Sequence, residues 1–129
     1  MKYNLITPVD LSPPPNFYEL AVARIMAKLA RSDVKFVRRG SNTTPDIYIV
    51  KTRRYWEIKN IEGNGKRTIQ NNLRKASGQS KNIIISLLKP KCKMSTLTAI
   101  GRIKTELNRA NDIKRIILIT KDQETIALK

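Results

Sequence analysis

Hydrophobic positions along the chain switch between helical and strand-like spacing. Three stretches carry apolar residues every three or four positions, which is typical of helices that bury one face. Between them lie short runs that alternate apolar and polar residues or are apolar throughout, as strands do. The predicted helices span about 16–31, 66–79 and 95–110, and the predicted strands about 34–38, 46–50, 55–61, 83–88, 116–119 and 124–128, the last at an edge. The order αβββαβαβ, followed by this edge strand, predicts an α/β domain.

Each predicted helix has an apolar stripe that we expect to face the core. Asn16 offers a cap for the first helix, and the break at Gly63-Asn64-Gly65 precedes the second. The runs 83–88 and 116–119 are almost wholly apolar, which predicts strands covered on both faces. The expected stripes are Phe17, Leu20, Ala21, Ile25 and Leu29 in the first helix, Ile69, Leu73 and Ala76 in the second, and Leu97, Ile100, Lys104 and Leu107 in the third.

The beginning of the chain has a different composition from the rest. Ser12-Pro13-Pro14-Pro15 is a stiff run that can continue neither a helix nor a central strand. We therefore expect residues 1–15 to be a proline-rich linker or extension and residues 16–129 to form one domain. A chain of 129 residues is long enough for one core and leaves little room for a second.

Composition narrows the range of partners. Lys and Arg number 26 and Asp and Glu ten, a formal charge of +16, and self-repulsion at this density favours a polyanionic partner. A membrane surface is not expected, because the only Trp lies in a strand-like segment rather than on a basic amphipathic helix. With no long apolar run and no signal-like start, the chain is expected to be soluble. Nucleic acid is the predicted partner.

Two absences limit the chemistry. The chain has no histidine, which excludes histidine-based acid–base catalysis and a Ser-His-Asp triad. Its single cysteine, Cys92, can form neither an internal disulfide nor a Cys/His zinc site, and we expect it to be an ordinary loop residue. A bound metal would therefore be a hard, oxygen-liganded ion, Mg²⁺ or Mn²⁺.

The strands at 46–50 and 55–61 predict a hairpin with two distinct faces. An even-numbered loop within Lys51 to Arg54 makes opposed residue numbers sum to 105, so that Asp46 is expected opposite Lys59 and Tyr48 opposite Glu57. An odd-numbered loop would mix the polar and apolar sets. The expected polar face holds Asp46, Tyr48, Tyr55, Glu57 and Lys59, and the expected core face holds Ile47, Ile49, Trp56 and Ile58.

This polar face carries the chain's candidate catalytic chemistry. Two neighbouring carboxylates repel, which raises one pKa unless a cation neutralises them, and a divalent metal is the usual solution. Such a metal could polarise a phosphoryl oxygen, while Lys59 could orient a water or stabilise charge on phosphorus. The alternative is a cross-strand salt bridge between Asp46 and Lys59 on a solvated face.

These residues resemble a known pattern. Pro45-Asp46, ten intervening residues and Glu57-Ile58-Lys59 look like the PD-(D/E)xK nuclease signature, and the αβββαβ order is similar to that superfamily's core, a central mixed sheet flanked by helices. The phrases Pro-Asp-Ile-Tyr-Ile, Tyr-Trp-Glu-Ile-Lys-Asn and Ile69-Gln-Asn-Asn-Leu-Arg-Lys-Ala76, with Gln79 and Asn82 to Ile85, resemble the C-terminal toxin domains of CdiA-type contact-dependent growth-inhibition proteins. The resemblance covers roughly residues 17–120 and implies a tRNA-cleaving nuclease.

The resemblance also implies roles for individual residues. Asp46 and Glu57 would be the metal ligands, the Ile58 carbonyl would complete the coordination, and Lys59 would assist the water. The superfamily often adds an acidic residue from the first helix, and Glu19 is the candidate, although its position three residues after Asn16 equally fits a capping box. Gln79 either lies near the active site or simply closes the second helix. Expected nucleic-acid contacts, each of which could instead be a solvated position, are Arg67, Gln70, Arg74, Lys75, Gln79, Lys89, Lys91 and Lys93.

Three functions follow from these observations. The first is a metal-dependent endonuclease toxin acting on tRNA, a monomer carried on a larger secreted bacterial surface protein, active in the target-cell cytoplasm and neutralised by an acidic cognate immunity protein. The second is a DNA endonuclease such as a Holliday-junction resolvase, which is similar in length, charge and motif. The third is a noncatalytic RNA-binding domain in which Asp46, Glu57 and Lys59 only pair with one another.

Overall fold

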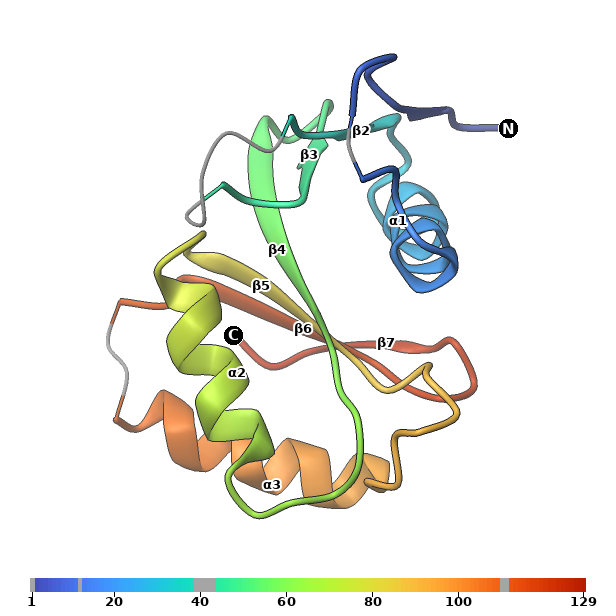
Figure 1. Cartoon of the computed structure of the whole chain (residues 1–129). Coiled ribbons are helices and arrows are strands. Elements are labelled where there is room, and N and C mark those ends of the chain that lie inside the picture. Colours follow the sequence, from blue (N-terminus) through green and yellow to red (C-terminus); the bar gives the residue numbers. More distant parts are fainter. Residues whose placement is uncertain (1, 12, 39–43, 110–111) are drawn as a thin grey trace.

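The computed structural model describes residues 2–11, 13–38, 44–109 and 112–129. Within these ranges, seven strands form one sheet and three helices flank it (Figure 1). The elements are β1 (Leu5–Ile6), α1 (Phe17–Ala30), β2 (Val34–Phe36), β3 (Ile47–Ile49), β4 (Arg54–Asn60), α2 (Thr68–Ser77), β5 (Asn82–Ser86), α3 (Thr96–Leu107), β6 (Arg115–Ile119) and β7 (Thr125–Ala127). The predicted α/β fold, a mixed sheet flanked by helices, is confirmed. None of the helices in the described part of the chain is long and apolar enough to cross a membrane.

The order of strands in the sheet repeats their order in the chain. β1 pairs with β2 in parallel, β2, β3 and β4 form an antiparallel meander, β4, β5 and β6 are parallel, and β7 returns antiparallel to β6. The β4–β5 and β5–β6 crossovers contain α2 and α3, which cover the same face, while α1, which lies between β1 and β2 in the chain, is on the other (Figure 1). β4 therefore joins a meander on one side to a crossover sheet on the other.

The N-terminal residues differ from what their composition predicts. Leu5 and Ile6 form β1, paired with Val34 and Lys35, and Leu11 is buried beside α1. Part of the expected linker is thus a strand of the sheet, and the observed order begins with β1 and ends with β7. Two paired residues are too few to produce a recognisable alternation, which explains why the pattern gave no sign of β1.

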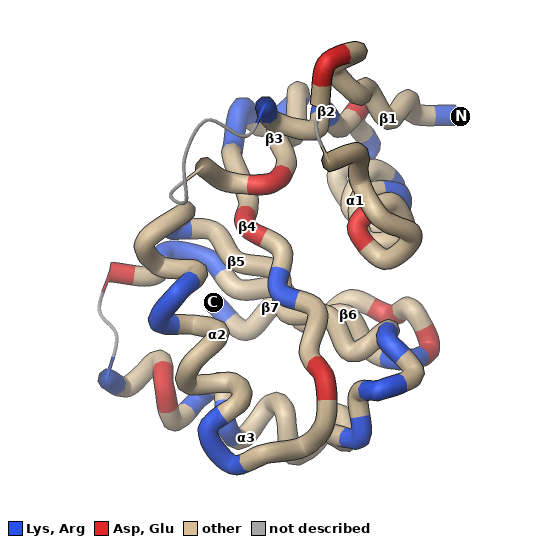
Figure 2. The backbone as a smooth tube through the Cα atoms, in the orientation of Figure 1, with Lys and Arg blue, Asp and Glu red and all other residues tan. Residues whose placement is uncertain are grey.

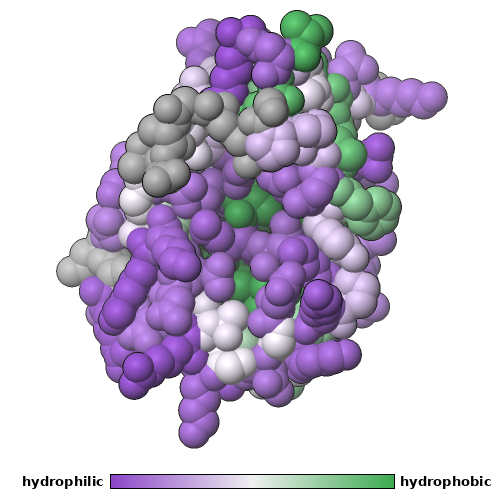
Figure 3. Space-filling view, in the orientation of Figure 1, coloured by the Kyte–Doolittle hydropathy of each residue, from purple (hydrophilic) through white to green (hydrophobic). Residues whose placement is uncertain are grey.

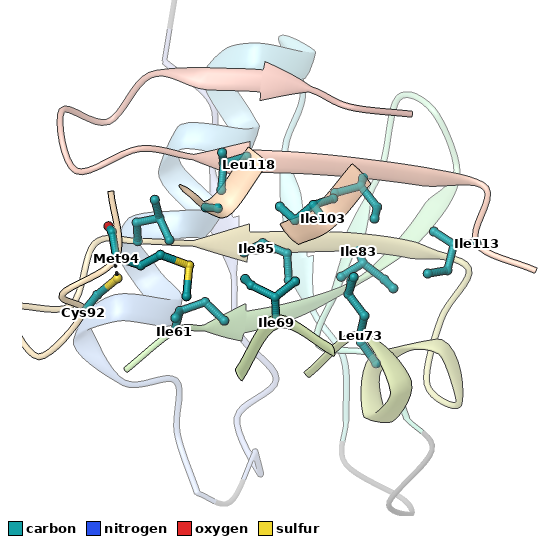
Figure 4. Packing of buried hydrophobic residues seen from close by; sticks show 14 residues of the cluster. Ile61, Ile69, Leu73, Ile83, Ile85, Cys92, Met94, Ile103, Ile113 and Leu118 are labelled. Atoms are coloured by element: carbon teal, nitrogen blue, oxygen red, sulfur yellow. Dashed lines mark hydrogen bonds between the residues drawn. The ribbon is translucent and has the colours of Figure 1, made fainter. Parts of the chain in front are cut away.

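Two hydrophobic clusters form the core, one on each face of the sheet. Ile83 and Ile85 point to the cluster under α2 and α3 (Figure 4), while Ile84 between them belongs to the cluster under α1. All three are fully buried, as the continuous apolar run predicts. Cys92 is also buried, in the cluster shared by α2 and α3.

The helices bury partly different faces from those expected. α2 buries Ile69, Leu73 and Ala76 as predicted. In α1 the larger apolar residues Phe17 and Leu29 are exposed, and in α3 Leu97 is exposed. The buried sets are Val22, Ala23, Met26 and Ala27 in α1 and Ala99, Ile103 and Glu106 in α3, and the alanines in both allow close packing against their neighbours.

Candidate active site

The hairpin of β3 and β4 sets the geometry of the candidate site. Tyr48 lies opposite Tyr55, and Ile49 lies opposite Arg54, so opposed numbers sum to 103 instead of the expected 105. The connection is a four-residue turn over residues 50–53, closed by an Arg53 N–H that donates to the Ile49 carbonyl (2.9 Å). Arg53 takes a left-handed conformation with φ 57°. With neither Gly nor Asn in this turn, nothing in the sequence specified which residue would take that conformation.

A shift of two positions changes partners but preserves faces. The core face is as predicted, because Ile47, Ile49, Trp56 and Ile58 are all buried in the cluster under α1. On the other face, Tyr48 and Tyr55 are in contact with ring centroids 4.7 Å apart. The expected pairings of Asp46 with Lys59 and of Tyr48 with Glu57 are wrong. In the observed register Asp46 lies opposite Glu57.

Asp46 lies at the bend just before β3. Its N–H donates to the Trp56 carbonyl (3.1 Å), and its Oδ2 accepts a hydrogen bond from the Ile58 N–H (2.8 Å). Since the N–H and C=O of a strand residue point to the same side, the Ile58 carbonyl is directed toward the same region as Asp46. The backbone of β4 thus fixes the orientation of the Asp46 carboxylate.

Glu57 is a buried acid with an unusual pKa. Its side chain is 2% exposed, and its Oε2 lies 3.2 Å from Lys59 Nζ. Burial is the main cause that raises the pKa of Glu57 from the usual 4.5 to about 8, and the adjacent Asp46 raises it further, against an opposing effect of Lys59. The pair of acids therefore behaves as expected for neighbouring carboxylates, with one proton held near neutral pH.

A polar cleft of about 360 Å³ brings several candidate residues together. The segments of α1, β4 and the approach to β3 that carry acidic residues lie near one another in Figure 2, and Figure 3 shows that this face of the molecule is largely hydrophilic. Six of the candidate residues named from the sequence line the cleft, with Asn16, Ile58 and Asn60: Glu19, Asp46, Glu57, Lys59, Gln79 and Lys89. Residues from three other regions of the chain thus converge on the hairpin.

Glu19 both caps the first turn of α1 and lines the cleft. Asn16 Oδ1 accepts a hydrogen bond from the Glu19 N–H (2.8 Å), and Glu19 Oε1 accepts one from the Asn16 N–H (3.1 Å), which completes a capping box. Glu19 also lines the cleft, because it lies one turn before Val22 and Ala23 on the face of α1 that packs against the sheet.

The other basic candidates lie outside the cleft. Lys89 alone reaches it, with its Nζ 2.8 Å from Glu62 Oε1 and 5.7 Å from the ring centroid of Tyr18. The remaining candidates are on the outer side of α2 or in the loop after β5, where Gln70 is half-buried and the rest are exposed: Arg67, Gln70, Arg74, Lys75, Lys91 and Lys93. The structure leaves their contribution to nucleic-acid binding a prediction.

Sequence reasoning missed Asn60 as a site residue. Asn60 follows Lys59 at the end of β4 and lines the cleft, and its Oδ1 is buried without a hydrogen-bond partner among the described residues. Glu57 Oε1 is likewise buried without a hydrogen-bond partner among the described residues. Strict alternation placed Asn60 on the core face, so only its chemistry, an amide directly after a charged run, could have indicated it.

The cleft suits a hard divalent cation with few protein ligands. Within the described ranges, no group of three acidic, histidine or cysteine residues is close enough to hold a metal. Asp46 and Glu57 supply two carboxylates, with a buried unpaired oxygen on Glu57 and the Ile58 carbonyl nearby. Mg²⁺ usually binds through one or two carboxylates and keeps several waters, so this donor set fits it.

Comparisons with known proteins place this chain in a class of toxin domains. Residues 43–125 match the family model for the contact-dependent growth inhibition CdiA C-terminal domain. Because the match covers more than half of the chain, the chain belongs to this family. It is therefore a toxin effector domain of contact-dependent growth inhibition, part of a larger surface protein and delivered into target cells.

A solved structure has the same fold over the whole chain. A chain of the CdiA-CT/CdiI toxin and immunity complex from Burkholderia pseudomallei aligns with a TM-score of 0.64 and 18% sequence identity, covering 98% of each chain. At this identity the likeness concerns the fold alone. No curated protein matches the chain.

Proposed function

We propose that this toxin domain is a metal-dependent endonuclease of the PD-(D/E)xK type that cleaves tRNA. The observation that carries the proposal is the contact between Asp46 and the buried Glu57, with Lys59 3.2 Å from Glu57, in a polar cleft. A structural salt bridge needs neither a second carboxylate beside the buried one nor an acid held protonated at neutral pH. Both are what a divalent cation would relieve.

The residues of the cleft divide the work as follows. Asp46 and Glu57 would hold Mg²⁺ or Mn²⁺ together with the Ile58 carbonyl, and Glu57 would give up its proton on binding the ion. Such an ion would supply charge stabilisation at the scissile phosphodiester and lower the pKa of a bound water. Lys59 would orient the attacking water and offset negative charge developing on phosphorus. Glu19 and Gln79 line the cleft within reach of the same space.

The proposed substrate follows from charge and from the family. A net charge of +16 favours a polyanion. Aromatic residues make up only 5% of the chain, which is few for a base-stacking platform, so recognition of the shape and backbone of a folded RNA fits better. The resemblance to CdiA-type tRNA nucleases selects tRNA among folded RNAs.

Incubation with total tRNA, other RNA and plasmid DNA tests this function directly, with Mg²⁺ in one series and EDTA in the other. The expected result is cleavage of tRNA that requires Mg²⁺ and is lost in Asp46→Asn and Glu57→Gln, while Glu124→Gln on the exposed turn before β7 cleaves normally. Cleavage of DNA in preference to RNA would favour the resolvase-like alternative. RNA binding without cleavage under any metal would identify a noncatalytic binding domain.

A cognate partner completes the proposed biology. The related complex contains an immunity protein, and we propose that this chain, a monomer acting in the target-cell cytoplasm, is likewise neutralised by one of acidic pI. Opposite charges would give fast association that slows as salt rises. Association rates measured at low and high salt test this directly. A partner of basic pI, or a complex insensitive to salt, would contradict it, and sedimentation of the free domain as a dimer would contradict the monomer.

A further inference from the structure

A second cavity lies on the opposite face of β4 from the carboxylates. Side chains alternate along this strand, so Glu57 points into the cleft while Arg54 and Trp56 point to the α1 side of the sheet. There Arg54 and Trp56 line a cavity of about 660 Å³ together with residues of β6, of β7 and of the segments flanking them. No lining residue belongs to a helix, so the floor of the cavity is the sheet itself.

The rim of this cavity is cationic. It carries Arg54, Lys114, Arg115 and Lys129, and its lining contains no acidic residue. None of the four forms an ion pair within the described part of the chain. Four like charges around one space repel one another, and an anion bound among them would relieve this repulsion.

Arg115 is held in position for such an anion. Its Nη1 donates to Asn82 Oδ1 (3.2 Å), and Asn82 Nδ2 in turn donates to the Tyr55 carbonyl (2.9 Å). The guanidinium therefore loses less freedom on binding than an unsupported surface arginine would. Guanidinium groups bind phosphate through paired hydrogen bonds and also stack on flat rings.

The floor of the cavity is apolar, in contrast to its rim. Trp56 is buried, Ile117 is half-buried and Ala127 is exposed, and all three lie on the same face of the sheet. An apolar floor surrounded by cations matches a ligand with one apolar part, such as a base, and one phosphate. The volume lies within the usual range for small-molecule sites, roughly 300–1,000 Å³.

From this combination we infer that the cavity is a nucleotide-binding site, in which the base lies on the floor and the cations hold the phosphate. The nucleotide is either free or one unit of a polynucleotide, since both present the same chemistry. The inference does not rest on the proposed nuclease activity, because the carboxylate cleft on the other face of β4 contributes nothing to it.

The single tryptophan of the chain provides the measurement, because Trp56 lies in the floor. Its fluorescence is followed during titration of the intact domain, in EDTA, with AMP, with adenosine and with inorganic phosphate, and calorimetry gives the same affinities independently. AMP is expected to produce a saturable change in fluorescence. Adenosine alone and phosphate alone are each expected to bind at least about tenfold more weakly than AMP, because each makes only part of the contacts. Absence of saturable AMP binding overturns the inference.

Two pairs of substitutions locate the site. Arg54→Gln with Arg115→Gln is expected to weaken AMP binding about tenfold or more, and Lys114→Gln with Lys129→Gln about threefold, since exposed lysines act as simple point charges. The control, Lys66→Gln with Lys104→Gln, removes the same charge from exposed positions outside the cavity and is expected to leave affinity unchanged. Equal affinities in all three double variants would contradict the assignment, provided that their melting temperatures match that of the parent.

Competition identifies the source of the nucleotide. If a 5′-phosphorylated single-stranded oligonucleotide displaces AMP, the site takes a unit of a polynucleotide, and if it does not, the site takes a free nucleotide. A polyglutamate peptide that displaces AMP with equal affinity would instead indicate a docking surface for an acidic protein and would overturn the inference.

Discussion

The two faces of β4 carry clusters of opposite charge, built from adjacent residues of the strand. On one face Glu57 is 2% exposed beside Asp46, and burial holds its proton to about pH 8. On the other face two of the four cations around Trp56 are exposed and two are half-buried, and none of the four forms an ion pair within the described part of the chain. A buried acid beside a second carboxylate is costly and needs a counterion at a fixed point, whereas a more exposed cluster of cations costs less and can accept a larger anion. The contrast agrees with the two proposals, chemistry on the first face and binding on the second.

Removal of a carboxylate should have the largest effect on the difference between the two faces. Asp46→Asn and Glu57→Gln keep the size of the side chain but remove a ligand charge, so we expect Mg²⁺-dependent tRNA cleavage to fall by about 10³-fold or more. Initial rates of cleavage of labelled tRNA measure the effect, and retention of tRNA on a filter shows whether binding survives. Parental rates in both variants would remove the hairpin from the catalytic assignment.

Loss of Lys59 should have a smaller effect on rate and a distinct effect on pH dependence. Lys59→Met removes the group that orients the water, and we expect a loss of about 10²-fold in kcat. Since Lys59 opposes the rise in the pKa of Glu57, its removal should also shift the acidic limb of the pH–rate profile to higher pH. A loss of rate with an unmoved profile would mean that Lys59 does not act on Glu57.

The buried acid should also appear in the pH dependence of stability. Between about pH 4.5 and about pH 8 the folded state keeps the Glu57 proton and the unfolded state does not, so raising the pH favours unfolding. In EDTA we expect the melting temperature to fall by more than about 10 °C across this interval. Thermal unfolding of Glu57→Gln is the control, because a neutral amide at this position should flatten the dependence. A melting temperature that rises over the same interval in the parent would contradict the raised pKa.

Glu19 allows the smallest and most selective test. Gln at this position can still accept from the Asn16 N–H, so Glu19→Gln should change the free energy of unfolding little, whereas Asn16→Ala should lower it by about 1 kcal/mol. Because Glu19 lines the cleft, we expect about tenfold slower cleavage in Glu19→Gln. Chemical denaturation and cleavage rates separate the two effects, and unchanged cleavage would leave Glu19 as a helix cap only.

The regular elements could be predicted because each depends on local pattern. The run at 83–88 and the stripe of α2 carry their burial in their own residue types, and the two faces of the hairpin follow from alternation. The pairing of Asp46 with Glu57 depends instead on where the turn closes, and the left-handed residue there is Arg53, a type with no preference for that conformation. The sequence could therefore predict which side chains of the hairpin share a face, but not which residues lie opposite one another.

The faces of α1 and the position of β1 show a second limit. The more hydrophobic side of α1 includes Phe17, yet the side with Ala23 and Ala27 is buried, because packing distance to the sheet rather than hydrophobicity decides the contact. The choice of that side also brings Glu19 toward the cleft. The second cavity could not be predicted at all, since its cations come from β4, from the start of β6 and from the segment after β7, which are far apart in the chain.

The order of the strands has a mechanical consequence. Because neighbours in the sheet are neighbours in the chain, a pull on either end acts first on an edge strand, β1 or β7, and each strand that peels away exposes the next. Each strand can therefore leave the sheet from an edge, one at a time, without being pulled out from between two neighbours. Under force the domain should unfold from its two edges inward, and β4, which carries Glu57 and Lys59, is among the last strands to separate.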